Sequence, residues 1–387
     1  MSDRAATPHD PAADAPASRS TGEHDHEASP GWKLRLEARF GLLDPIQILV
    51  FRSYGTPTRL HVCGRVTERK AVQGTTEESS TWRNILNTIR RLDSDEIPGA
   101  RIRAHFHRRQ WETVTDREGY FIVELDPPEP LEAGWHEVEL ELVNSIGTPV
   151  RRLEREQVLV PPVTADFGVI SDLDDTVIRT HSTDLLQMVA TVFGGGAHDR
   201  VVVPGIPAFY RALAGGANDA GANPIFYVSR SSWNLYDLFE EFLDVNDIPA
   251  GPLILTDQRL IEEPSRVMGS DHHKFETITT LLRTYPTTRF ILVGDSGMKD
   301  PEIYEGIVQN HPGRILAVYI HDVSEAERDE EVQRIAGSLQ AQGVPLVRMR
   351  QVDGAAAHAE SQGWISARGL AEVRESLALR DGEPDGH

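Results

Sequence analysis

The residues most able to do chemistry in this chain lie in the stretch FGVISDLDDTVIRT, at positions 167–180. Asp172, Asp174 and Asp175 follow an apolar run there and come directly before Thr176. Neighbouring carboxylates repel one another, and burying any of them without a partner costs free energy. A cation and an anionic substrate that bind between them would offset this cost. The stretch therefore predicts a site for both.

Three further groups of polar residues follow apolar runs or begin helices farther along the chain. Ser229 and Arg230 follow PIFYV, and Lys274 opens a predicted helix in HHKFET. Asp295 and Asp300 follow FILVG with the spacing G-D-x-x-x-x-D. Taken singly, these residues have ordinary explanations, because Asp and Ser commonly cap helices and an isolated lysine is usually solvated.

Taken together and in this order, the four groups predict a phosphoryl-transfer site. Transfer from a phosphate ester requires an in-line nucleophile, a proton donor for the leaving oxygen, and cations that spread the developing charge. We expect Asp172 to attack phosphorus and form an aspartyl-phosphate. We expect Asp174 to protonate the leaving alkoxide and then to activate water.

The same residues also supply candidates for the metal and the phosphate. Mg²⁺ prefers hard oxygen ligands, and Asp174 would contribute its backbone carbonyl. The candidate Mg²⁺ ligands are Asp172, Asp174 and Asp295. The candidates for holding the phosphate are Thr176, Ser229, Arg230 and Lys274. Trp233 and Asn234, just past Ser229, are candidates for the rim of the site.

The elements that must position these residues are visible in the pattern after residue 166. Short apolar runs (FGVI, PIFYV, FILVG, ILAVYI) alternate there with helical stretches such as WNLYDLFEEFLDV and KFETITTLLRTY. Strands that alternate with helices predict right-handed βαβ units and a parallel sheet. Functional residues of such sheets gather beyond the carboxyl ends of the strands. We therefore expect an α/β, Rossmann-like domain over residues 163–380, with helices on both faces of its sheet.

The pattern before residue 160 is different and is typical of strands. RIRAHFH and HEVELELV alternate apolar with polar residues, which indicates a sheet with one solvated face. We expect a smaller β-sandwich-like domain of the transthyretin or immunoglobulin-like type over residues 31–162. Residues 1–30 are rich in Ala, Pro, Asp, Ser and His and predict a disordered tail, and residues 381–387 predict a second tail.

Composition limits the partners and the compartment. The chain has 387 residues and a formal net charge of −21, which argues against binding nucleic acid. It contains no apolar run long enough for a transmembrane helix and no apolar signal core at its N-terminus. The single cysteine, Cys63, cannot form an internal disulfide and lies in an alternating strand pattern, so we interpret it as a packing residue. We expect a cytoplasmic protein.

The four motifs resemble those of the haloacid dehalogenase phosphatase superfamily: D-x-D-x-T, then Ser, then Lys, then G-D-x-x-x-x-D. A narrower resemblance rests on SDLDDTVIRT, FYVSRSSWNLYDLFEEFL, HHKFETI and LVGDSGMKDPEIYEGI. These stretches are similar to the catalytic domain of the actin-patch-protein type phosphatidate phosphatases. The upstream stretch GLLDPIQILVFRSYGTPTRLHVCGRV is similar to the domain that precedes it in bacterial members.

The resemblance implies Mg²⁺-dependent removal of phosphate from phosphatidate, which yields diacylglycerol. It matches Asp172 to the nucleophile, Asp174 to the acid/base, and Asp295 to a metal ligand. It matches Ser229 and Lys274 to the phosphate holders. Asp300 matches the second acid of the last motif, which either contacts metal-bound waters or orients Lys274. One position departs from the family pattern, because Ser232 stands where a proline is expected.

Two segments bear on whether the substrate is a membrane lipid. The basic amphipathic helix predicted over residues 81–92 could lie on a membrane surface, and the apolar segment 184–196 could dip into lipid. Packing against the protein is the ordinary explanation for each of them. Peripheral contact with a membrane is therefore an open alternative.

Three hypotheses about function remain open at this stage. The first is a Mg²⁺-dependent phosphatidate phosphatase. The second is the same chemistry on a soluble metabolite or a phosphoprotein. The third is a non-catalytic binding protein, with the strand-rich domain docking a partner that the sequence does not identify.

Overall fold

The structure is a computed structural model of the chain. The residues that it describes are 46–68, 97–145, 148–173, 202–221, 223–256, 270–323 and 326–381. The predictions that fall outside these residues are the tail 1–30, the helix 81–92, the segment 184–196 and most of the tail 381–387. Among the helices of the described ranges, none combines the length and the apolar composition that crossing a bilayer requires.

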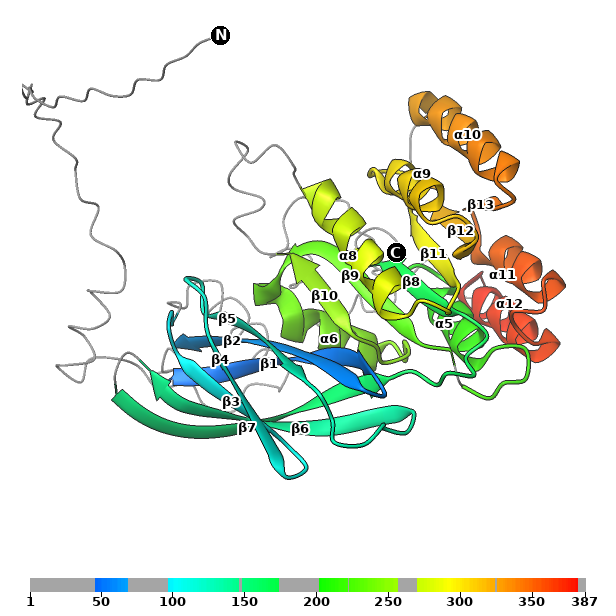
Figure 1. The fold of residues 1–387 in the computed structure, drawn as a ribbon. Helices are drawn as coiled ribbons and strands as arrows, with labels where there is room; N and C mark the ends of the chain where they lie inside the picture. Colours follow the sequence, from blue (N-terminus) through cyan, green and yellow to red (C-terminus); the bar gives the residue numbers. More distant parts are fainter. Residues whose placement is uncertain are drawn as a thin grey trace, which may run out of the picture.

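The strand-rich region forms a seven-stranded sheet (Figure 1). Its order is β4-β3-β6-β7-β1-β2-β5. The strands are β1 (Ile46–Thr56), β2 (Arg59–Glu68), β3 (Arg101–Phe106), β4 (Arg109–Val114), β5 (Tyr120–Leu125), β6 (Gly134–Ser145) and β7 (Thr148–Val160). Buried and exposed positions alternate along β3 and β5, as the sequence pattern predicts.

The prediction of a two-sheet sandwich is wrong for this region, because all seven strands belong to one sheet. β7 pairs in parallel with β1 through Ser53–Val158 and Tyr54–Leu159, and this pairing joins the two halves. The sheet curls around one apolar core to which every strand except β4 contributes fully buried residues. Alternation predicts which face of a strand is buried, but it does not predict which strands pair.

The second region is an α/β domain with a six-stranded parallel sheet, as predicted. The order is β10-β9-β8-β11-β12-β13. The strands are β8 (Gly168–Asp172), β9 (Ile225–Ser232), β10 (Leu253–Thr256), β11 (Phe290–Asp295), β12 (Ile315–His321) and β13 (Leu346–Met349). The helices are α5 (Ile206–Gly215), the 3-10 turn η1 (Trp233–Leu235), α6 (Tyr236–Val245), α8 (Ser270–Thr284), α9 (Asp300–Asn310), α10 (Ala326–Ala341), α11 (Val352–Ser361) and α12 (Ala367–Asp381).

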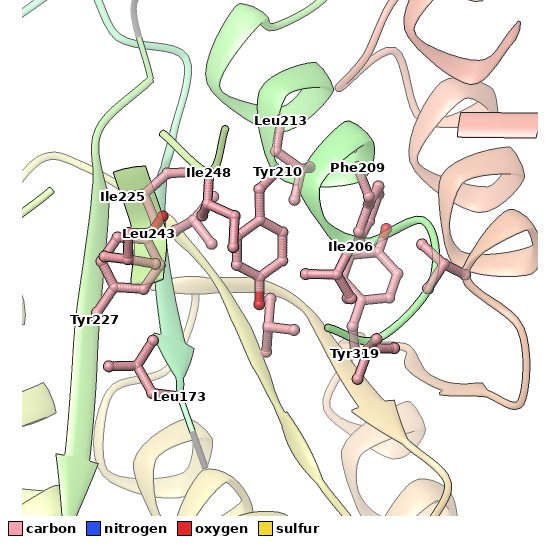
Figure 2. Packing of buried hydrophobic residues seen from close by; sticks show 14 of the residues in the cluster. Leu173, Ile206, Phe209, Tyr210, Leu213, Ile225, Tyr227, Leu243, Ile248 and Tyr319 are labelled. Carbon is pink, nitrogen blue, oxygen red and sulfur yellow. The ribbon is translucent and has the colours of Figure 1, made fainter. Parts of the chain in front are cut away.

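Helices cover both faces of this sheet, which confirms that part of the prediction. Alternate strand residues point to opposite faces, so Val169 and Ile170 belong to different cores. One core is completed by α5, α6, α11 and α12, and the other by α8, α9 and α10. Figure 2 shows the first core, where Tyr210 and Leu213 of α5 pack near Ile225 and Tyr227 of β9.

The strand order of the six-stranded sheet reverses between two neighbouring strands. From β8 the chain proceeds outward through β9 and β10 on one side, and from β11 it proceeds through β12 and β13 on the other. Such a reversal between neighbouring strands leaves a crevice beyond their carboxyl ends. Here the reversal falls between β8 and β11, which end at Asp172 and Asp295.

Candidate active site

Three buried carboxylates meet at this reversal point. Asp172 ends β8, Asp295 ends β11, and Asp300 is the first residue of α9. One carboxylate oxygen from each lies within 4.8 Å of the others. All three side chains are almost fully buried, so their mutual repulsion is weakly screened by solvent.

Lys274 of α8 provides the positive charge that these acids need. Its Nζ lies 2.7 Å from Oδ1 of Asp172 and 2.5 Å from Oδ1 of Asp300. Burial opposes the charge on this lysine, but the two carboxylates outweigh burial and raise its pKa above the ordinary value. Lys274 is therefore an ammonium at neutral pH and holds two of the three acids in place.

The loop between Asp295 and Asp300 is closed by hydrogen bonds that explain the spacing of the last motif. The backbone N–H of Asp295 donates to Oδ2 of Asp300 over 3.2 Å, and the N–H of Met298 donates to Oδ1 of Asp295 over 2.9 Å. Asp300 thus contacts both Lys274 and the backbone of Asp295. Of the two roles that the family resemblance left open for Asp300, this geometry supports the orientation of Lys274.

Gly294 is the residue that makes room for Asp300. A Cβ placed on Gly294 would overlap Oδ2 of Asp300 and would lie 2.9 Å from its Cγ. Carbon atoms cannot approach so closely, and Asp300 is held from two sides. The glycine of the G-D-x-x-x-x-D motif is therefore a steric requirement of the acidic cluster.

We expect Gly294→Ala to lower the free energy of unfolding by about 1–3 kcal/mol, the usual cost of overpacking a buried position. The matched control is Gly337→Ala in α10, where an added Cβ would meet nothing within 4 Å. Alanine stabilises an exposed helix position by about 0.5–1 kcal/mol relative to glycine, so the two variants should differ in sign. Urea unfolding measures both, and equal effects would contradict the steric role of Gly294.

Ser229 and Arg230 lie on the strand next to Asp172. Val228 pairs with Asp172 in the parallel sheet. Ser229 therefore lies one residue farther toward the carboxyl ends of the strands than Asp172, the candidate nucleophile. Ser229 is fully buried, and its Oγ accepts a hydrogen bond from the N–H of Ser231 over 2.9 Å. Arg230 is directed to another acid, since its Nη1 lies 3.2 Å from Oδ1 of Asp271.

Sequence reasoning did not find Asp271, which links two cations beside the site. Oδ2 of Asp271 lies 3.2 Å from Nζ of Lys299, in addition to its contact with Arg230. Asp271 occupies the first turn of α8, three residues before Lys274. The signal available in the sequence was an acidic residue in the first turn of a predicted helix. Acidic residues are common there because they interact favourably with the helix dipole, so this signal did not single out Asp271.

Tyr304 is a second residue that the motifs did not indicate. Its ring lies beneath Lys274, with Nζ 5.8 Å from the ring centroid. Its hydroxyl donates to the backbone oxygen of Val293 over 2.8 Å. Burial, followed by the nearby carboxylates of Asp300 and Asp172, raises the pKa of Tyr304 well above its ordinary value. Tyr304 is therefore a neutral packing partner of the charged cluster.

The remaining predicted site residues are only partly described. Asp174 and Thr176 lie outside the described residues, and so does the side chain of Asn234, so their roles stay predictions. The ring of Trp233 stacks on Phe51 of β1, with centroids 4.3 Å apart. The ring of Trp233 therefore contacts the first sheet, and its position at the rim of the site stays a prediction.

The donor set of the cluster fits a hard divalent cation. Asp172, Asp295 and Asp300 offer carboxylate oxygens, which Mg²⁺ and Ca²⁺ prefer. Three carboxylates and the ammonium of Lys274 leave two negative charges to be neutralised. The cluster contains two of the predicted ligands, Asp172 and Asp295, together with Asp300. The third predicted ligand, Asp174, lies outside the described residues.

Comparison with known proteins supports the resemblance stated from the motifs. Residues 167–322 match the family described as phosphatidate phosphatase APP1, catalytic domain. Phosphatidate phosphatase APP1 of Saccharomyces cerevisiae is 34% identical over 174 residues, which are 43% of this chain and 28% of the yeast protein. An uncharacterised protein of Schizosaccharomyces pombe is 25% identical over 223 residues, which are 55% of this chain and 35% of that protein.

The chain thus spans about a third of the length of these relatives. Among solved structures, a carbohydrate acetylesterase from Xanthomonas citri aligns with a TM-score of 0.28 and 11% identity, covering 76% of this chain and 75% of that one. A score this low does not indicate a shared fold.

The matched segment contains the whole described acidic cluster together with Ser229 and Lys274. It begins one residue before β8 and ends one residue after β12. The family resemblance predicted from the four motifs is therefore confirmed for this part of the chain. Over residues 167–322 the chain is similar to the phosphatidate phosphatase APP1 catalytic-domain family.

Proposed function

We propose that this protein is a Mg²⁺-dependent phosphatase that hydrolyses phosphatidate to diacylglycerol through an aspartyl-phosphate. The observation that carries the proposal is the buried cluster of Asp172, Asp295 and Asp300 around Lys274, which lies wholly within the family match. The parallel sheet and its reversal between β8 and β11 are also what a haloacid dehalogenase-type fold requires.

Asp172 is the proposed nucleophile because it lies at the carboxyl end of a central strand and its orientation is fixed. The salt bridge from Lys274 to Oδ1 restrains the carboxylate, and restraint of this kind lowers the entropic cost of in-line attack. Attack forms the bond from Asp172 to phosphorus and breaks the bond from phosphorus to the leaving alkoxide.

Asp174 is the proposed proton donor for that alkoxide. The same side chain, now a carboxylate, takes a proton from water as the water attacks phosphorus and releases Asp172. Ser229 and Lys274 are the proposed holders of the nonreacting phosphoryl oxygens. Lys274 suits this role because it is cationic at neutral pH and already contacts the nucleophile.

Asp172 and Asp295 are the proposed holders of Mg²⁺, with Asp174 as the further ligand predicted from the motif, and Asp300 is proposed to orient Lys274. When bound, Mg²⁺ would neutralise charge on the phosphoryl oxygens as it develops. The chain's own part is to keep three acids together, which Lys274 does through its two salt bridges. Contact with a membrane surface follows from the proposal only because phosphatidate is a membrane lipid.

The test is phosphate release from phosphatidate in detergent micelles with Mg²⁺, run beside a soluble aryl phosphate. We expect the lipid to be hydrolysed, and we expect EDTA to lower the rate by about 100-fold or more, since a catalytic cation contributes several kcal/mol. Adding Mg²⁺ in excess of EDTA should restore the rate. A rate that survives chelation would contradict the metal dependence.

The two substrates separate the alternative functions. Hydrolysis of the aryl phosphate without the lipid would keep the phosphatase chemistry and assign the substrate to a soluble ester or a phosphoprotein. Turnover of neither compound in the presence of Mg²⁺ would contradict the enzyme proposal and favour a binding protein.

A further inference from the structure

The first sheet contacts the catalytic domain through β1, and its main contact is an aromatic stack. The Phe51 ring lies 4.3 Å from Trp233 and 4.6 Å from Tyr236, measured between ring centroids. Phe51 is 1% exposed and belongs to the buried core of the catalytic domain rather than to the core of its own sheet. Tyr120 of β5 adds a further ring 6.5 Å from Trp233.

Polar contacts reinforce this stack. The side chain of Arg52 pairs with Glu240 over 2.9 Å and with Asp244 over 3.2 Å, and both acids belong to α6. The backbone N–H of Arg52 donates to the hydroxyl of Tyr236. The turn η1 and the length of α6 are therefore tied to β1 by rings, charges and a backbone hydrogen bond.

A second set of contacts ties β1 to the elements on the other face of the catalytic sheet. Tyr54 meets Phe226 of β9 edge-on, with centroids 5.9 Å apart. Tyr285, the residue after α8, donates its hydroxyl to the backbone oxygen of Gly55 over 3.0 Å. One strand of the first sheet thus contacts β9, which carries Ser229, and the residue that follows the C-terminal end of α8.

These contacts fall on one side of the active site. Figure 1 shows β1 beside β10 and α6, at the edge of the catalytic sheet. β9 is next to this edge, whereas β8 and β11, which carry Asp172 and Asp295, are the third and fourth strands from it. Ser229 and Arg230 of β9 are therefore nearer to the first sheet, in strand order, than Asp172 and Asp295.

We propose that Phe51 is a positioning residue for the phosphate-binding side of the active site, acting through Trp233. This inference rests on the proposed phosphatase function. Trp233 follows Arg230 by three residues, so an anchor at Trp233 determines where the chain from Ser229 to Ser232 runs. Binding groups lose effectiveness when the residues that support them are loose. Phe51 lies outside the segment that matches the catalytic-domain family, so the site depends on a residue of the other domain.

The test compares Phe51→Leu with Phe106→Leu. Phe106 is also buried, with 4% of its surface exposed, but it belongs to the core of the first sheet and not to the contact with the catalytic domain. Both substitutions remove one buried ring and keep an apolar side chain. A second pair of variants, Trp233→Leu and Trp233→Phe, tests whether an aromatic ring at position 233 is needed for phosphate binding. The measurements are the Kd for inorganic phosphate in saturating Mg²⁺, the Kd for Mg²⁺ alone, and KM and kcat for an aryl phosphate.

We expect Phe51→Leu and Trp233→Leu to raise the Kd for phosphate and the KM by about tenfold, because small displacements of binding groups have large effects. The Kd for Mg²⁺ should stay within about twofold of the wild type, since sites without shared partners behave independently. Phe106→Leu should bind phosphate as the wild type does, and Trp233→Phe should lose less phosphate affinity than Trp233→Leu.

Three results would overturn the positioning role. They are wild-type phosphate affinity in Phe51→Leu, an equal loss in Phe106→Leu, and parallel losses of phosphate and Mg²⁺ affinity, which would indicate general destabilisation. A wild type that neither hydrolyses the ester nor binds phosphate is a different result. It would contradict the proposed function itself, and this inference with it.

Discussion

Asp172→Asn is expected to lower kcat/KM for a phosphate ester by about 10⁴-fold or more, the scale seen when a residue of a covalent catalytic unit is removed. The amide is nearly the same size as the carboxylate, and its oxygen can still accept a hydrogen bond from Lys274. It cannot act as the anionic nucleophile, and it is a poor ligand for Mg²⁺ compared with a carboxylate. Initial rates on phosphatidate micelles and on an aryl phosphate measure the loss.

The matched control for this variant is Asp322→Asn. Asp322 is an aspartate just past the end of a strand of the same sheet, its side chain is 8% exposed, and it pairs with Arg348 over 2.8 Å. The pairing of Arg348 with Asp329 remains when Asp322 is changed. We expect Asp322→Asn to keep activity within about threefold of the wild type, as for sites with no shared partner. Full activity in Asp172→Asn would exclude the covalent mechanism.

Lys274→Met is expected to lower the free energy of unfolding by about 3–5 kcal/mol in EDTA, because it leaves buried carboxylates without their partner. Lys274 is 1% exposed and bridges Asp172 and Asp300, so no solvent replaces the lost charge. The raised pKa of Lys274 means that its stabilisation is present at neutral pH and would be lost only in strongly alkaline solution. Urea unfolding at neutral pH measures the difference.

Mg²⁺ distinguishes this explanation from a simple packing defect. A cation bound among the three acids would replace part of the lost charge, so Mg²⁺ should stabilise Lys274→Met more than it stabilises the wild type. Lys299→Met is the stability control, since Lys299 is 66% exposed and its pairing with Asp271 is solvated. Lys299→Met should lower the free energy of unfolding by no more than about 0.5 kcal/mol. Equal stabilisation of Lys274→Met and the wild type by Mg²⁺ would contradict a cation site at the cluster.

The sequence by itself determined the α/β class of the second region and the convergence of its acidic residues. The apolar runs that predicted strands correspond to β8, β9, β11 and β12, and the helical stretches correspond to α6 and α8. These are local patterns, set by the periodicity of short segments, and parallel strands follow from their alternation with helices. Since parallel strands end at a common edge, the motifs that follow them had to converge, as Asp172, Lys274 and Asp295 do.

Other features were decided only by contacts between residues far apart in the chain. The pairing of β1 with β7 made one curled sheet where alternation alone suggested two. Trp233 lies in the conspicuous region after Ser229, but its partner Phe51 comes from the other domain. Asp300 had two roles open to it as the last acid of its motif, and only the folded chain, in which it contacts Lys274, supports one of them.

The physical reason is the same in each case. Periodicity and motif spacing report how a segment places its own side chains, because they depend on local backbone geometry. Which segments meet depends on the total free energy of burying and pairing their surfaces, which no single segment contains. The residues of the acidic cluster were therefore legible in the sequence, whereas the contact between Trp233 and the first sheet became visible only in the tertiary structure.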